Sequence, residues 1–286
     1  MAQNWKRVKV GNYFEIGNDL PFTLIAGPCQ LESKEHALFM AGELTKIAKD
    51  AGINFIFKAS FDKANRTAKG NARGVGLDTG LEIFQEIKDK FNIPVITDVH
   101  EINQVEKLAS VVDIIQIPSL LSRQTDLIAA AAATGKVVNI KKGQFMGPSQ
   151  AKYLVEKAGA TQNNIANVIL TDRGSCFGFD QLVSDPTFII DLARPGYPVV
   201  MDCTHAVQRP AGQGSCSGGN RDMAEVYGRS ALSTGICGGI FIECHDDPDN
   251  AKSDGPNSVR LDYMPTLLKR FKDTDSVAKK IPFDKF

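Results

Sequence analysis

The stretch Asn54-Phe-Ile-Phe-Lys-Ala-Ser60 is a short apolar run that ends in polar residues. Its apolar residues are consecutive rather than alternating, which is typical of a parallel β-strand buried on both faces. Together with this stretch, the similar runs that recur along the chain predict eight parallel strands. The other runs span residues 22–29, 94–100, 113–119, 137–145, 167–175, 198–205 and 239–245.

Segments with helical periodicity separate these runs. Ser33 is placed to cap a helix that Gly52 would end. Eight strand-then-helix units within about 250 residues predict a (β/α)8 TIM barrel, and a doubly wound open sheet is the alternative. The apolar face of the first helix is Met40, Leu44, Ile47 and Ala51, and that of the second is Leu81, Phe84, Ile87 and Phe91.

The chain is expected to form one domain over residues 1–286, because its length suits one large barrel and no linker or low-complexity tract interrupts it. Residues 1–20 precede the first strand. The segment around Gly11 predicts a short N-terminal β-hairpin there, which could serve as a lid.

The charge balance and the apolar segments of the chain exclude several classes of protein. The 33 basic and 33 acidic residues cancel, which argues against a nucleic-acid or anionic-membrane partner. The N-terminus lacks the apolar core of a signal peptide, and the apolar run at residues 127–133 is far short of the ~20 residues of a membrane helix. We therefore expect a cytoplasmic protein whose six cysteines form no disulfides.

Basic residues gather after neighbouring strands, on one half of the predicted rim. The carboxyl ends of the strands carry the active site in barrels of this type. Clustered cations repel one another unless an anion offsets their charge, so the cluster predicts a phosphate site with room for two phosphates. Its members are Lys58, Lys63, Arg66, Arg123, Lys141, Lys142 and Arg173.

The other half of the rim carries a different set: Cys29, His205, Glu243 and Asp254. Barrel closure brings the ends of the seventh, eighth and first strands together, so these side chains can meet. A thiolate, an imidazole and two carboxylates suit Zn²⁺, Fe²⁺ or Mn²⁺ better than Mg²⁺ or Ca²⁺. Taken singly, each residue also fits a structural role.

Cys244 has the opposite strand parity to Glu243 and should point toward the helices. Five cysteines are therefore expected to be structural: Cys176, Cys203, Cys216, Cys237 and Cys244.

Several motifs together resemble the 3-deoxy-D-manno-octulosonate 8-phosphate synthases over about residues 20–275. They are Ala26-Gly-Pro-Cys29, Phe57-Lys-Ala-Ser-Phe-Asp-Lys-Ala-Asn-Arg-Thr67, Thr97-Asp-Val-His100, Arg123-Gln-Thr-Asp126, Asn139-Ile-Lys-Lys142, Asp172-Arg-Gly-Ser175, Thr204-His205 and Ser253-Asp-Gly-Pro256. The resemblance implies condensation of phosphoenolpyruvate with arabinose 5-phosphate in lipopolysaccharide biosynthesis. It also implies a homotetramer.

The resemblance assigns a role to each candidate residue. Phosphoenolpyruvate would contact Lys58, Ser60, Lys63, Gln116, Arg123, Lys141 and Arg173. The sugar phosphate would contact Asn65, Arg66, Thr67 and Asp98, with Arg66 and Thr67 supplied by a neighbouring subunit. Catalytic roles are expected for Lys63, Asp98, His205 and Cys29.

The family has a metal-dependent and a metal-free branch, and the metal-free branch has Asn at the position of Cys29. Cys29 therefore implies the metal-dependent branch, with one divalent ion (Zn, Fe, Mn or Co) on Cys29, His205, Glu243 and Asp254. The chain departs from the family pattern at residues 68–73, where the family usually has serines.

Two alternatives remain open. A heptulosonate 7-phosphate synthase would use erythrose 4-phosphate, but it typically has Pro in place of the Ala64-Asn65 pair. A metal-dependent barrel hydrolase would have His-x-His after the first strand, where this chain has Gly27-Pro-Cys29.

Overall fold

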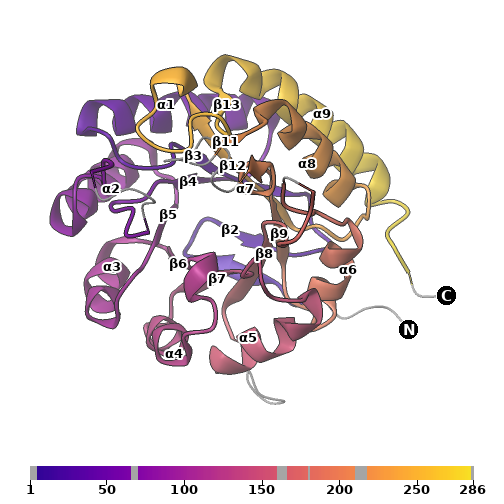
Figure 1. Cartoon of the computed structure of the whole chain (residues 1–286). Helices are drawn as coiled ribbons and strands as arrows, with labels where there is room; N and C mark the ends of the chain where they lie inside the picture. The colour runs from indigo at the N-terminus through magenta and orange to yellow at the C-terminus, as the bar shows by residue number, and fades with distance from the viewer. Residues whose placement is uncertain (1–4, 66–69, 160–165, 180, 210–217, 285–286) are drawn as a thin grey trace.

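The computed structural model describes residues 5–65, 70–159, 166–179, 181–209 and 218–284. Eight parallel strands form a closed ring with helices around the outside (Figure 1), and β12 closes the ring by pairing with both β3 and β9. The predicted TIM barrel is confirmed, and the open sheet is excluded. The barrel strands are β3 (Thr23–Gly27), β4 (Phe55–Lys58), β5 (Val95–Asp98), β6 (Ile114–Ile117), β7 (Val137–Lys141), β8 (Val168–Asp172), β9 (Val199–Asp202) and β12 (Gly239–His245).

The inward-facing side chains change character along the strands. Near the amino ends they are apolar, and they pack together as one cluster across the barrel: Ile25, Ile56, Ile96, Ile114, Val137, Ile169, Val200 and Phe241. Two residues further along most strands the next inward position is polar, as at Lys58, Asp98 and Glu243. The barrel interior is therefore apolar at one end and charged at the other.

The predicted N-terminal hairpin is present, as β1 (Val8–Val10) paired with β2 (Phe14–Ile16). It lies across the centre of the ring in Figure 1, and its Val8, Val10 and Ile16 belong to the apolar cluster at the amino ends of the strands. The hairpin therefore closes the end of the barrel opposite the polar residues and does not act as a lid over them.

The helix that follows β3 begins and ends as the sequence predicts. Ser33 Oγ accepts a hydrogen bond from the His36 backbone N–H at 3.1 Å, and Gly52 ends the helix in the left-handed conformation. The main helices are α1 (Lys34–Ala51), α2 (Leu77–Phe91), α3 (Val105–Val111), α4 (Thr125–Ala133), α5 (Ala151–Lys157), α6 (Thr187–Ala193), α8 (Ala224–Leu232) and α9 (Met264–Ala278).

Small elements extend the loops at the polar end of the barrel. A one-turn helix, α7 (Cys203–Ala206), follows β9 directly, and β10 (Gln208–Arg209) pairs with β11 (Gly218–Gly219). A short strand, β13 (Val259–Arg260), pairs with the end of β12. In the described ranges, no helix combines the length and apolarity needed to cross a bilayer.

Candidate active site

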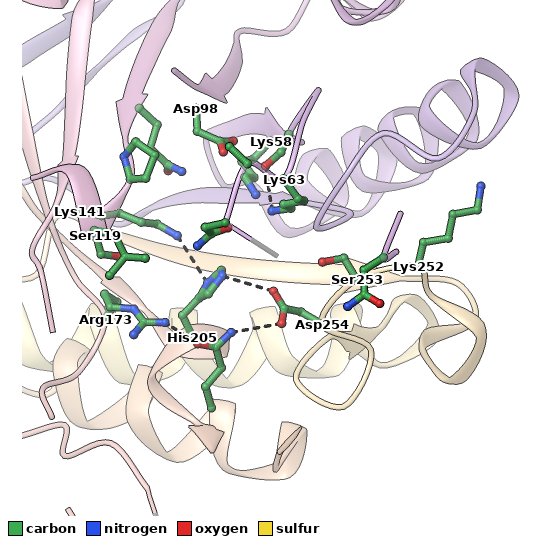
Figure 2. Close-up of a pocket in the computed structure, with 18 of the residues that line it drawn as sticks. Lys58, Lys63, Asp98, Ser119, Lys141, Arg173, His205, Lys252, Ser253 and Asp254 are labelled. Atoms are coloured by element: carbon green, nitrogen blue, oxygen red, sulfur yellow. Dashed lines mark hydrogen bonds and ion pairs between the residues drawn. The ribbon is translucent and has the colours of Figure 1, made fainter. Parts of the chain in front are cut away.

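A cavity of about 960 Å³ opens at the carboxyl ends of the barrel strands (Figure 2). Its wall combines residues from β4, β5, β6 and β7 with the loops that follow β8, β9 and β12. The predicted site residues among its lining are Lys58, Ser60, Lys63, Asn65, Asp98, Gln116, Lys141, Arg173, His205 and Asp254.

Three of the four predicted metal ligands meet beside this cavity. One donor atom from each of Cys29, Glu243 and Asp254 lies within 4.8 Å of the others. The Cys29 Sγ atom is 3.2 Å from Asp254 Oδ2. Burial, reinforced by the charge of Glu243, raises the pKa of the Cys29 thiol well above its ordinary value. The positive charges of Lys63 and Lys58 oppose this rise.

His205, the fourth predicted ligand, lies near two of these residues but is not in the group of three. Its Nε2 atom is 3.6 Å from Glu243 Oε1 and 3.8 Å from Asp254 Oδ2. Its Nδ1 atom lies 2.8 Å from Asp202 Oδ2, so the carboxylate orients the ring and directs Nε2 toward the other ligands. Histidine ligands of metals are commonly held this way.

The donor set fits a borderline divalent ion. Sulfur, nitrogen and two carboxylates match the ligands that zinc and its neighbours accept. Glu243 is fully buried, and its Oε2 atom has no hydrogen-bond partner. A buried carboxylate oxygen without a partner is costly unless a ligand completes it.

Asp202 contacts two of the predicted site residues, and the sequence interpretation did not include it. It is fully buried at the end of β9, where it pairs with Lys141 Nζ at 2.6 Å as well as with His205. Its Oδ1 atom also accepts the His205 backbone N–H at 2.9 Å, which starts α7. Charge from His205 and Lys141 keeps the pKa of Asp202 below its ordinary value although burial opposes this.

The buried lysines are paired with carboxylates. Lys58 Nζ donates to Glu243 Oε1 at 3.0 Å, and it is almost fully buried. Lys63 Nζ donates to Ser60 Oγ at 2.9 Å and lies 4.0 Å from Glu243 Oε1. Burial acts against the charge of Lys63, but the surrounding Cys29 and carboxylates raise its pKa, so it stays a cation.

Asp98 at the end of β5 and Arg173 after β8 both face the cavity, from separate parts of the rim (Figure 2). Asp98 Oδ2 is 3.1 Å from His100 Nε2, and its Oδ1 atom is buried without a hydrogen bond. Arg173 donates to Gln208 at 2.5 Å, and its Nε atom is also buried without a partner. Gln208 in turn donates to Asp254 Oδ1 at 3.2 Å, so it links the cationic and the anionic sides.

Not every predicted cation reaches the cavity. Lys142 points to the other side of β7, where it pairs with Asp172 at 3.3 Å in the outer core; its inclusion in the rim cluster is wrong. The reason is strand parity, since Lys141 points inward and neighbouring residues alternate. Arg123 is exposed and is not part of the cavity lining. Arg66 and Thr67 lie outside the described residues.

Among the described residues, the cysteines other than Cys29 belong neither to the cavity lining nor to the Cys29 group. Cys244 packs in the outer core with Cys203 and Cys237, as strand parity predicts. Cys176 is half-buried, and Cys216 lies outside the described residues.

Comparison with known proteins assigns the chain to a family. A family model described as the DAHP synthetase I family matches residues 7–280. The chain is 52% identical to the 2-dehydro-3-deoxyphosphooctonate aldolase of Chelativorans sp. (strain BNC1), over 96% of this chain and 98% of that protein. It is 51% identical to the protein of the same name from Granulibacter bethesdensis, over 95% of each chain. The relative of that name in Rickettsia prowazekii is 49% identical over 96% of this chain and 99% of its own length. This chain belongs to the DAHP synthetase I family.

Proposed function

We propose that this protein is a 3-deoxy-D-manno-octulosonate 8-phosphate synthase, a transferase for which 2-dehydro-3-deoxyphosphooctonate aldolase is another name. It condenses phosphoenolpyruvate with D-arabinose 5-phosphate and water, and it releases phosphate. The observation that carries this proposal is identity of about half the residues, over nearly the full length, to proteins of that name. The product is the eight-carbon acid of lipopolysaccharide biosynthesis.

The charge pattern of the cavity supports two anionic substrates. Lys58 and Lys141 pair closely with Glu243 and Asp202. Lys63 donates its hydrogen bond to Ser60 and is 4.0 Å from Glu243, and Arg173 donates to Gln208. Lys63 and Arg173 are therefore the cations best placed to bind the phosphate and carboxylate of phosphoenolpyruvate. Gln116 lies between them on the wall and is held by a hydrogen bond from Asn139 at 3.1 Å.

One divalent ion would be held by Cys29, His205, Glu243 and Asp254. When bound, such an ion supplies Lewis acidity that acidifies water or polarises the aldehyde. Asp202 and Lys58 would act as outer partners of this ion, because Asp202 orients His205 and Lys58 orients Glu243.

Side chains of the cavity can assist the condensation itself. The C2–C3 π electrons of phosphoenolpyruvate form the bond from C3 to the aldehyde carbon, which leaves C2 cationic. Water adds at C2, and the C2–O bond to phosphate breaks as C2 becomes a carbonyl. Of the two protons that water loses, one replaces the proton given to the aldehyde oxygen and the other leaves with phosphate. Lys63 is a cation beside the cavity, so it can donate a proton to the aldehyde oxygen as that oxygen becomes negative. Asp98, kept ionised by His100 and Lys63, can accept hydrogen bonds from the sugar hydroxyls.

The loop after β4 carries the residues that would bind the sugar phosphate. Asn65 lines the cavity, and Arg66 and Thr67 follow it in the chain. In the proposed homotetramer, Arg66 and Thr67 bind the phosphate of a neighbouring subunit's substrate.

A second candidate is condensation with erythrose 4-phosphate, because the description of the matching family model names that type of synthase. One experiment separates the two: phosphate release is measured from phosphoenolpyruvate with arabinose 5-phosphate or erythrose 4-phosphate, each with and without chelator. We expect release with the five-carbon sugar, lost on chelation and restored by Mn²⁺, Co²⁺ or Zn²⁺. Preference for the four-carbon sugar would contradict the assignment.

A further inference from the structure

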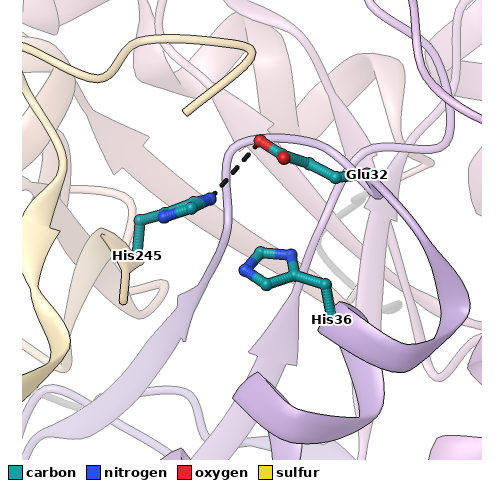
Figure 3. Close-up of side chains that lie close together, drawn as sticks. All are labelled: Glu32, His36 and His245. Carbon is teal, nitrogen blue, oxygen red and sulfur yellow. Dashed lines mark ion pairs between the residues drawn. The ribbon is translucent and has the colours of Figure 1, made fainter. Parts of the chain in front are cut away.

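A second group of potential metal ligands lies outside the cavity (Figure 3). Glu32 precedes α1, His36 lies in the first turn of α1, and His245 is the last residue of β12. One donor atom from each lies within 4.8 Å of the other two. None of the three lines the cavity or belongs to the ligand set of Cys29.

The two imidazoles are packed together in a protected place. Their ring centroids are 4.6 Å apart, and the side chains of His36 and His245 are only 17% and 8% exposed. His36 Nδ1 and His245 Nε2 are both buried without a hydrogen-bond partner. Unsatisfied ring nitrogens are costly to bury, and a bound cation would give them a partner.

The opposite ring nitrogens are occupied by one carboxylate. Asp246 Oδ1 is 3.0 Å from His36 Nε2 and 3.1 Å from His245 Nδ1. A carboxylate on the far nitrogen of a ligating histidine fixes the tautomer and raises the basicity of the near nitrogen. Asp246 therefore lies beside the outer nitrogen of both rings and is hydrogen-bonded to that of His36.

One contact competes with this arrangement. The Asp247 backbone N–H donates to His245 Nδ1 at 2.9 Å, which requires the ring proton on Nε2, where it faces Glu32 Oε1 at 3.4 Å. A metal on Nε2 requires that ring proton to move to Nδ1, where it can donate to Asp246, and the hydrogen bond from the Asp247 N–H is then lost. The cluster can thus hold either a proton or a metal ion between His245 and Glu32.

We propose that Glu32, His36 and His245 form a second divalent-metal site, with Asp246 as the outer carboxylate. Two imidazoles and a carboxylate select Zn²⁺ and similar borderline ions, and they leave a fourth position for water. The site joins the start of α1 to the end of β12, two segments more than 200 residues apart.

The site also contacts the loop that carries Asp254. The Lys252 backbone N–H donates to Glu32 Oε1 at 2.8 Å, and Lys252 Nζ donates to the Glu32 carbonyl at 3.3 Å. A carboxylate oxygen can accept this bond and still bind a metal. An ion here fixes Glu32 and so supports the loop at its base.

The test is metal stoichiometry in the full-length protein, stripped with chelator, reloaded with Zn²⁺ or Co²⁺ and desalted. The variants are Cys29→Ala, His36→Leu and their combination, with Glu32→Gln as a second lesion in the new site. Glu35→Gln is the matched control, because Glu35 is an exposed carboxylate in the same first turn of α1. Circular dichroism confirms that each variant is folded.

We expect two equivalents in the wild type and in Glu35→Gln, one in each single-site variant, and none in the combination. The Co²⁺ spectrum tells the two sites apart, since only the Cys29 site gives a sulfur-to-cobalt charge-transfer band. His36→Leu should keep that band and weaken the other site by at least ~100-fold, because outer partners alone are worth ~10–100-fold.

Other outcomes separate this proposal from the proposed function. If Cys29→Ala holds no metal while the wild type holds one equivalent, the second site is absent and the proposed function stands. If the wild type lacks the charge-transfer band yet loses its metal in His36→Leu, the second site exists and the Cys29 site fails. Equal metal in wild type, His36→Leu and Glu32→Gln would overturn the second site.

Discussion

The two ends of the barrel interior are built on the same strands but have opposite chemistry. Ile56 and Lys58 lie two residues apart on β4, and Phe241 and Glu243 lie two residues apart on β12. The first of each pair packs in the apolar cluster that the hairpin closes, and the second belongs to the site. A step of two residues along a strand therefore separates the apolar cluster, which stabilises the fold, from the candidate active site.

The comparison teaches where stability and activity can be changed separately. At the amino ends of the strands, one apolar side chain can replace another of similar volume, because these side chains fill the interior. At the carboxyl end, Lys58 pairs with Glu243 and Lys141 pairs with Asp202, all buried. Removal of one member leaves an unpaired buried charge, so a lesion there affects folding as well as function.

The largest effect is expected at Cys29. Cys29→Ala removes the only sulfur from the ligand set, and we expect it to be inactive and to lack the metal of this site. Cys29→Asn should fold, hold little metal there and keep a residual activity that chelator does not affect, because an Asn amide is similar in size and can hydrogen-bond to neighbours. Elemental analysis beside phosphate release checks both variants.

Two results would contradict this prediction. If Cys29→Asn keeps a full equivalent of metal with His36→Leu in the same chain, Cys29 is not a principal ligand. Full activity of wild-type protein shown to be free of metal would equally exclude the metal-dependent assignment.

Much of this architecture could be predicted from the sequence. Consecutive apolar runs gave all eight barrel strands, and Ser33 and Gly52 marked the ends of α1 correctly. Closure of the barrel placed Cys29, Glu243 and Asp254 together before any geometry was known. These features depend on local pattern or on ring closure, both of which the order of residues specifies.

Other features depend on which side chains meet in three dimensions. Asp202 looked like an ordinary strand end, and its role follows from Lys141 and His205 on either side of it. Strand parity could have shown that Lys141 and Lys142 point to opposite sides of the strand, but the sequence analysis counted both as members of the cationic cluster. Which end of the barrel the hairpin closes depends on packing. His36 and His245 meet because the start of α1 lies near the end of β12.

A smaller effect is expected from Asp202→Asn, which keeps the volume but removes the charge between Lys141 and His205. We expect metal affinity at the Cys29 site to fall by ~10–100-fold, the usual range for a lost outer partner of a histidine ligand. Co²⁺ titration followed by the charge-transfer band measures it.

Asp172→Asn is the matched control, because Asp172 is a buried carboxylate paired with Lys142 on the outer face of the barrel. It should lower stability and leave metal affinity unchanged. If both variants weaken metal binding equally, the effect of Asp202→Asn comes from a general loss of packing, and the proposal that Asp202 positions His205 is wrong.

The smallest effect is expected at the closed end, from Ile16→Val. Ile16 is almost fully buried and packs against the apolar cluster, so loss of one methylene should cost about 0.5–1.5 kcal/mol in the free energy of unfolding. Denaturant unfolding measures this, with Ile281→Val as the control, since Ile281 is 75% exposed and should change little. Because Ile16 packs in the cluster at the apolar end of the barrel interior, kcat/KM and metal content should match the wild type. A fall in kcat/KM at full folding would mean that the hairpin influences the site through the strands, and the separation of the two ends would then fail.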